Sequence, residues 1–88
     1  MYAFIGYDAP NGRELRKIHR EAHLEKLKNL AKAGRIVLAG PFTDGSGSLI
    51  VFNCATRTEV ELIVKTDPYV MNRVFERYEI RPFEKVLP

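Results

Sequence analysis

Several strand-like segments of the chain are apolar at consecutive positions, and this feature restricts the possible folds most. Residues 36–39 read Ile-Val-Leu-Ala, residues 49–52 read Leu-Ile-Val-Phe, and residues 1–8 are rich in aromatic side chains. A strand in an antiparallel sheet with one wet face alternates between apolar and polar residues instead. Both faces of these strands therefore have to be covered.

Turn and capping signals divide the chain into the order β-α-β-β-α-β. The predicted strands cover residues 1–8, 35–42, 48–54 and 77–87, and the predicted helices cover residues 13–33, about 57–65 and 67–76. This order is that of a ferredoxin-like α+β fold, whose helices lie on one side of an antiparallel sheet. The helices leave the other face of the sheet bare, so we expect a homodimer in which two sheets face each other.

The length and cysteine content limit the class of protein. The 88 residues form one domain, residues 1–88, and 45% of them are apolar. No segment approaches the ~20 apolar residues of a membrane helix, and the N-terminus lacks the pattern of a signal peptide. A single cysteine, Cys54, cannot form a disulfide within the chain, which favours a cytoplasmic protein.

His23 is the first candidate for chemistry. It lies between Leu27 and Leu30 on the apolar arc of the long helix, and it can act as an acid or base near neutral pH. The alternative is a histidine that only makes a hydrogen bond in the core. His19 and His23 have the spacing of a zinc pair but no clear third ligand, so we expect no metal.

Two aspartates could orient the imidazole of His23. Asp44 lies in the loop between the second and third strands, and Asp67 begins the last helix. Each also has a purely structural reading, because Asp-Gly is a turn signature and Asp-Pro is a helix-capping signature. The sequence leaves open which of them acts.

Four further positions are candidates for contact with a ligand or for a structural role. Gly40-Pro41 is predicted to interrupt the ladder of the second strand, either as a bulge or as a point of close ligand approach. Ser48 could donate a hydrogen bond to a substrate or only close the hairpin. Cys54 has no partner motif and is expected to serve packing.

Positive charge is concentrated between residues 13 and 35, which contain eight Lys or Arg and three Glu. Such a segment is either a solvated helix face or an attractor of anions. RNA-recognition modules share the β-α-β-β-α-β order, but their third strand carries spaced aromatic and basic residues. Residues 48–53 contain one aromatic residue and no basic residue, so we expect no nucleic-acid binding and no membrane binding.

Short motifs occur along the whole chain in a characteristic order. They are Arg20-x-x-His23-Leu24, Gly34-Arg35, Ala39-Gly40-Pro41-Phe42, Asp44-Gly45, Gly47, Asp67-Pro68-Tyr69 and Arg81-Pro82-Phe83. Together they resemble the YciI-like (YCII-related) family. The resemblance implies a dimeric α/β barrel of two ferredoxin-like protomers and a cleft with a His–Asp pair, in which His23 is the matching histidine. One related member removes chloride from a chlorinated hydroxyquinol, and the loop between the second and third strands is short here.

The leading hypothesis is a small-molecule lyase or isomerase that works without a cofactor. His23 would transfer a proton while Asp44 or Asp67 holds its ring, which is the usual division of labour in such pairs. The residues predicted to bind an anionic or aromatic ligand are Arg20, Gly40, Pro41, Phe42, Ser48 and Tyr69. The alternatives are a ligand-binding or structural dimer without catalysis and, less favoured, an RNA-binding module.

Overall fold

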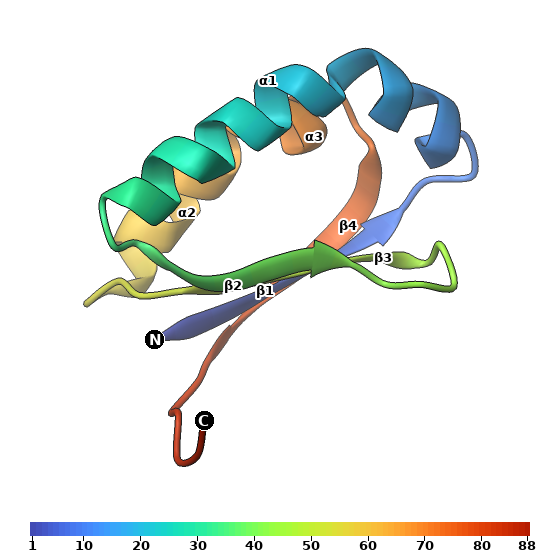
Figure 1. Ribbon diagram of the computed structural model, residues 1–88. Helices are drawn as coiled ribbons and strands as arrows, with labels where there is room; N and C mark the ends of the chain where they lie inside the picture. Colours follow the sequence, from blue (N-terminus) through green and yellow to red (C-terminus); the bar gives the residue numbers. More distant parts are fainter.

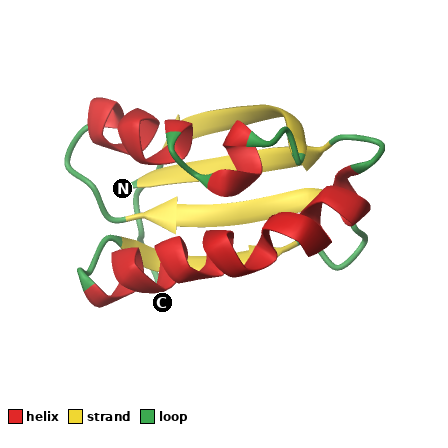
Figure 2. Cartoon of the chain, turned by 90° about the horizontal axis from the view of Figure 1, so that it is seen from above, coloured by secondary structure: helices red, strands yellow, loops and turns green.

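The computed structural model describes all 88 residues as a four-stranded antiparallel sheet with its helices on one face (Figures 1 and 2). The strands are β1 (Tyr2–Asp8), β2 (Ile36–Pro41), β3 (Gly47–Phe52) and β4 (Phe75–Pro82), and the helices are α1 (Gly12–Lys32), α2 (Arg57–Lys65) and α3 (Pro68–Met71). The order across the sheet is β2-β3-β1-β4. The predicted ferredoxin-like α+β fold is confirmed.

The helix ends follow the local signals of the sequence. Gly34 has a φ of 75°, which is the left-handed conformation that ends α1. Thr56 caps α2 by accepting a hydrogen bond from the Glu59 amide, and Asp67 caps α3 by accepting one from the Tyr69 amide. None of the helices combines the length and the apolar character needed to cross a membrane.

The last helix and the last strand differ from their predicted extents. The helix predicted over residues 67–76 ends at Met71, because Arg73 adopts a φ of 55° and turns the chain into β4. The strand predicted over residues 77–87 ends at Pro82. Its neighbour β1 begins at Tyr2, so the pairing closes with one bond from the Phe83 amide to the Met1 carbonyl. Residues 84–88 therefore have no strand to pair with.

The edge strand β2 contains the predicted irregularity at a different residue. Gly40 and Pro41 pair regularly with Leu49 and Ser48, whereas the register shifts between Ile36 and Leu38. The expected interruption at Gly40-Pro41 was therefore wrong, and Val37 is the extra residue. Pro41 is tolerated because an edge strand leaves every second amide without a ladder partner.

The core lies between the sheet and the helices. Its most deeply buried side chains are Phe4, Phe52, Val60 and Val74. Tyr2, Phe4, Ile50 and Ile80 point to the helices, because residues directly opposite across antiparallel strands share a face. Gly47 is required where β3 meets β1, since a Cβ atom there would overlap the Gly6 carbonyl.

The opposite face of the sheet, which we call the open face, has two different halves. Apolar side chains cover its β2, β3 and β1 portion: Leu38, Leu49, Val51, Ala3 and Ile5. Charged side chains cover its β4 portion, where Glu79 accepts a hydrogen bond from Tyr7 at 2.7 Å and Arg77 stacks on the Tyr7 ring. Only the first half fits the expectation of a sheet that is apolar on both faces.

Candidate functional site

His23 projects from the middle of α1 toward the sheet and is 6% exposed. Its Nδ1 lies 2.8 Å from Oδ1 and 3.1 Å from Oδ2 of Asp67. An ionised carboxylate can only accept hydrogen bonds, so Nδ1 carries the proton of the neutral ring. The second ring nitrogen, Nε2, makes no hydrogen bond within the chain, and in the neutral ring this nitrogen carries the lone pair.

Asp67 is held at the corner between α2 and α3, and it is 5% exposed. The same carboxylate accepts the Tyr69 amide at 2.8 Å, so the helix cap also fixes its direction toward His23. Lys26 of α1 secures this corner by donating hydrogen bonds to the Ile63 carbonyl and the Thr66 hydroxyl. Burial lowers the pKa of Lys26. The local capping motif thus supplies a buried partner for a histidine 44 positions earlier.

The Tyr69 ring holds the imidazole in its plane. The two rings are stacked with centroids 3.7 Å apart and planes 5° from parallel. Phe75 meets the Tyr69 ring edge-on at 5.9 Å, which supports it from the sheet side. Burial raises the pKa of the Tyr69 hydroxyl. The imidazole of His23 therefore has little freedom to turn.

Arg16 lies two helical turns before His23 and is fixed by two partners. Its Nε and Nη2 each donate to the Asp8 carboxylate at 2.8 Å, and Nη2 also donates to the Ser48 hydroxyl at 2.9 Å. The hydrogen bonds to Asp8 raise the pKa of Arg16, so it stays cationic. Its guanidinium also lies over the Tyr69 ring, 5.1 Å from the centroid.

These groups border a cavity of about 140 Å³ between α1 and the β2–β3 edge of the sheet, which we call the His23 cavity. The lining residues are Arg16, Arg20, His23, Leu24, Leu27, Ala39, Gly40, Pro41, Ser48, Ile50 and Tyr69. The volume is below the range of roughly 300–1,000 Å³ typical for drug-sized ligands, so the cavity suits a small molecule of about one ring. An imidazole, a cation and a buried hydroxyl, from His23, Arg16 and Ser48, meet in this space.

The structure separates the predicted residues into two groups. His23 and Asp67 are in contact, and five predicted ligand contacts line the cavity: Arg20, Gly40, Pro41, Ser48 and Tyr69. Asp44 and Phe42 do not line it. Asp44 is exposed in the β2–β3 turn, where its side chain accepts the Ser46 amide at 2.9 Å, and hydrogen bonding from Ser46 lowers the pKa of Asp44. Its geometry is that of a turn residue.

Arg16 and Asp8 were missed at the level of sequence. Arg16, Arg20 and His23 are spaced i, i+4 and i+7, which places them along one stripe of a helix. That spacing could have identified Arg16 as a neighbour of the histidine. No local pattern pairs Asp8 with Arg16, because the contact depends on how β1 leads into α1. No cluster of three or more His, Cys, Asp or Glu side chains is placed to hold a metal ion.

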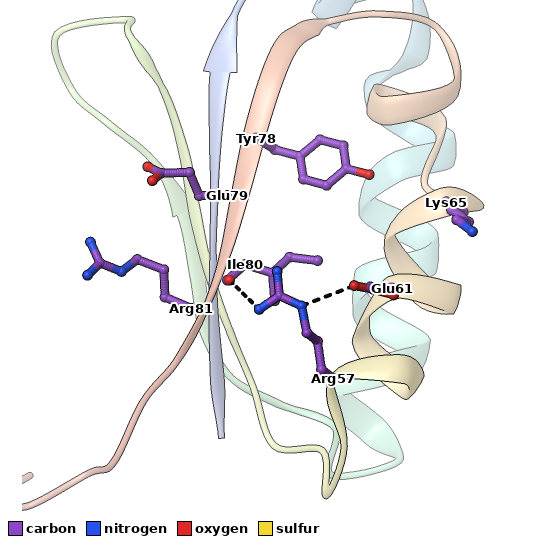
Figure 3. Close-up of a pocket in the computed structure, with 7 residues that line it drawn as sticks. All are labelled: Arg57, Glu61, Lys65, Tyr78, Glu79, Ile80 and Arg81. Atoms are coloured by element: carbon purple, nitrogen blue, oxygen red, sulfur yellow. Dashed lines mark hydrogen bonds and ion pairs between the residues drawn. The ribbon is translucent and has the colours of Figure 1, made fainter.

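A larger hollow of about 510 Å³ lies between α2 and β4, and we call it the α2–β4 groove (Figure 3). Seven residues line it: Arg57, Glu61, Lys65, Tyr78, Glu79, Ile80 and Arg81. Arg57 donates one hydrogen bond to Glu61 at 3.1 Å and another to the Ile80 carbonyl at 2.8 Å. The arginine therefore occupies part of the free edge of β4. The groove holds no buried acid–base pair, so its larger volume does not make it the better candidate.

Comparison with known proteins agrees with this fold and extends over the whole chain. The chain is 28% identical over 96 residues to Protein YciI of Escherichia coli, with 98% of both chains covered. It is 31% identical over 98 residues to an uncharacterized protein of Haemophilus influenzae, with 97% of both covered.

Among solved structures, the fold is similar to 5-chloro-2-hydroxyhydroquinone dehydrochlorinase from Burkholderia phenoliruptrix, in a complex with 2,5-dihydroxybenzoquinone. The TM-score is 0.84 at 22% identity, over 94% of this chain and 92% of the other. The model of the YCII-related domain matches residues 1–84. The chain therefore belongs to the YCII-related domain family.

Proposed function

We propose that this protein is an enzyme in which His23 transfers a proton to or from a small molecule bound in the His23 cavity. The observation that carries the proposal is the buried contact of 2.8 Å between Nδ1 of His23 and Asp67, with Nε2 left free. The carboxylate fixes the tautomer, and the stacked Tyr69 ring fixes the orientation. A histidine held in this way is positioned as a general base.

The reaction class that fits is a lyase or isomerase step that begins with removal of a proton from carbon. Proton transfer by a positioned histidine contributes typically ~10²–10⁴-fold in rate. The similar fold of a dehydrochlorinase supports this class, because loss of hydrogen chloride also requires loss of a proton. Because that similarity is at 22% identity, we propose only a reaction type and do not assign that enzyme's substrate to this chain.

Proton exchange at carbon tests the proposal directly. The probe is 2,5-dihydroxybenzoquinone, whose ring C–H bonds exchange when a carbon gains one proton and loses another. We expect the wild-type protein to accelerate loss of the ring proton signal in D₂O, followed by NMR. His23→Ala should lower the accelerated rate by about a hundredfold or more, as removal of a general base does.

The second histidine of the same helix provides the matched control. His19 does not line the His23 cavity, so His19→Ala should exchange at the wild-type rate. Equal exchange by the wild type and by His23→Ala would contradict the proposal. Binding of the probe without accelerated exchange would support the alternative of a ligand-binding protein instead.

We also propose that two copies of the chain associate through the apolar half of the open face. Leu38 on this half is 52% exposed, and Val37, next to it at the bulge, is 41% exposed, so apolar side chains remain uncovered in the single chain. The C-terminal segment, residues 83–88, leaves the body on the side away from the helices (Figure 1), and Val86 and Leu87 are each 81% exposed. A second copy bound to the open face would cover the apolar half of that face and the C-terminal segment.

Sedimentation of the wild type and of Leu38→Asp tests this association. The side chain of Leu38 is half exposed in the single chain, so the substitution should leave the fold intact and place a charge in the interface. We expect the wild type to sediment as a dimer and Leu38→Asp as a 10.1 kDa monomer. A monomeric wild type at micromolar concentration would contradict the proposal.

A further inference from the structure

Arg16 is fixed inside the His23 cavity, yet part of its guanidinium remains unused. We propose that Arg16 and Ser48 together receive the negative charge that develops on a substrate oxygen, which makes the substrate an enolisable carbonyl compound. This inference rests on the proposed proton transfer at His23. It adds the second half of the site, because a carbanion formed next to a carbonyl is stabilised as an enolate by donors placed at its oxygen.

Some N–H donors of Arg16 bind other side chains of the protein, and others have no partner in the chain. Nε and Nη2 are occupied by Asp8 and Ser48. Nη1 donates no hydrogen bond within the chain, so two of the five N–H groups of an arginine remain available. Asp8 therefore orients the guanidinium, while Nη1 keeps its capacity to bind an oxygen anion.

Ser48 offers a second donor at the same place. Its hydroxyl oxygen accepts the hydrogen bond from Arg16, and its own proton has no acceptor in the chain. Ser48 is 5% exposed and lines the cavity, so this proton is available to a bound molecule. A hydroxyl that already accepts from a cation is polarised and donates more strongly.

The proton acceptor and these donors face one space. His23 and Arg16 lie seven residues apart on α1, which is about 10 Å along the helix axis. The Tyr69 ring contacts both of them, stacked on the imidazole and beneath the guanidinium. Arg20 lies between them on the same stripe, lines the cavity and forms no ion pair, so it adds positive charge at the mouth.

The chemistry balances without a further reactant. The C–H bond next to the carbonyl breaks, its proton goes to Nε2 of His23, and its electron pair forms a carbon–carbon double bond. The carbonyl π pair moves to oxygen, which accepts hydrogen bonds from Ser48 and from Nη1 of Arg16. The step ends when the proton returns to another carbon, or when the electron pair expels a leaving group from the neighbouring carbon.

We call the pair of donors, Arg16 and Ser48, the receptor. Binding selectivity tests the receptor separately from the proposed base, His23. The probes are 2,5-dihydroxybenzoquinone, which is anionic when its acidic hydroxyls ionise, and hydroquinone, a neutral ring of similar size. Calorimetry should show that the wild type prefers the first by about tenfold or more, as expected for charge-assisted hydrogen bonds. Ser48→Ala should reduce that preference by roughly three- to tenfold, the loss of one buried hydrogen bond.

Arg16 itself needs a variant that does not leave Asp8 buried without a partner. The double variant Asp8→Asn with Arg16→Gln removes both charges, and it should abolish the preference for the anionic probe. Arg57→Gln, in the α2–β4 groove, is the matched arginine control and should keep the preference for the anionic probe. If the double variant fails to fold, which circular dichroism reports, Ser48→Ala decides the question alone.

The outcomes distinguish the receptor from the base. Wild-type selectivity in Ser48→Ala, or no selectivity in the wild-type protein, would overturn the receptor. His23→Ala should keep the preference for the anionic probe while it loses proton exchange. A protein with normal selectivity whose exchange is unaffected by His23→Ala would leave the receptor standing and remove the proposed base.

Discussion

The His23 cavity and the α2–β4 groove are both hollows beside the sheet, but they differ in how their charged groups are held. The groove is the larger, about 510 Å³ against about 140 Å³, and its ion pair between Arg57 and Glu61 joins side chains that are 52% and 45% exposed. The paired side chains of His23 and Asp67 are 7% and 8% exposed. Water screens the first pair and is nearly excluded from the second.

This difference explains why volume is a poor guide to chemistry in a small domain. In the groove, Arg57 and Tyr78 extend into the space between α2 and β4, whereas Glu79 and Arg81 point to the other side of the sheet (Figure 3). The His23 cavity arises because polar side chains are built into the layer between helix and sheet. Burying a polar group costs free energy unless it is hydrogen-bonded, and every fully buried side-chain nitrogen or oxygen of the chain has a hydrogen-bond partner.

The largest effect should come from removing the carboxylate of the buried pair. Asp67→Ala deletes both the partner of His23 and the cap of α3, so we expect the free energy of unfolding to fall by about 3 kcal/mol. Chemical denaturation measures this change. Asp67→Asn, which keeps an oxygen for the cap, should lose less stability, and an Asp67→Ala protein as stable as the wild type would contradict the structural importance of the pair.

The next effect tests the packing beneath the His23 cavity. A Cβ atom on Gly6 would lie 2.7 Å from the Phe75 ring, which in turn supports the Tyr69 ring. We expect Gly6→Ala to cost about 2 kcal/mol through overpacking and to slow proton exchange by displacing the stacked rings.

Gly40→Ala is the matched control for this substitution. A Cβ atom there meets nothing within 4 Å, so the free energy of unfolding should change by less than about 0.5 kcal/mol. Equal losses in the two glycine variants, compared by thermal unfolding, would show that the layer under the cavity is not closely packed.

A smaller effect is expected in the α2–β4 groove. Arg57→Ala breaks an exposed ion pair and one hydrogen bond to the β4 edge, so it should cost less than about 1 kcal/mol. Proton exchange and probe binding should remain at wild-type values. A loss of exchange in this variant would mean that the α2–β4 groove and the His23 cavity are energetically coupled.

The smallest effect is a dependence of stability on pH at the Tyr69 hydroxyl. Burial raises the pKa of Tyr69 above 10.0, so the folded state holds this proton more tightly than the unfolded state does. The contribution is fully present below pH 10.0 and is lost as the pH rises through the folded pKa. Unfolding free energies measured between about pH 9 and pH 11 should therefore fall less steeply in Tyr69→Phe than in the wild type. If the unfolding free energies of the two proteins fell equally with pH, the Tyr69 hydroxyl would not be the source of the dependence.

The two candidate aspartates show where reasoning from the sequence stops. Asp44 and Asp67 each follow a structural signature, and each was a possible partner for His23. In the structure both signatures are formed: Asp44 accepts the Ser46 amide in the turn, and Asp67 accepts the Tyr69 amide at the start of α3. Only Asp67 also reaches the imidazole, because the corner between α2 and α3 packs against α1 and the β2–β3 turn does not.

The sequence by itself determined the order of strands and helices, the capping residues and the direction of His23 toward the sheet. These features depend on interactions within a few residues, such as the period of a helix or the reach of a capping side chain. The tertiary structure alone decided that Asp67 is the partner and that Arg16 joins Asp8 to Ser48. Those contacts span 44, 8 and 32 positions of the chain, and no local pattern encodes which distant polar groups the packed layers bring together.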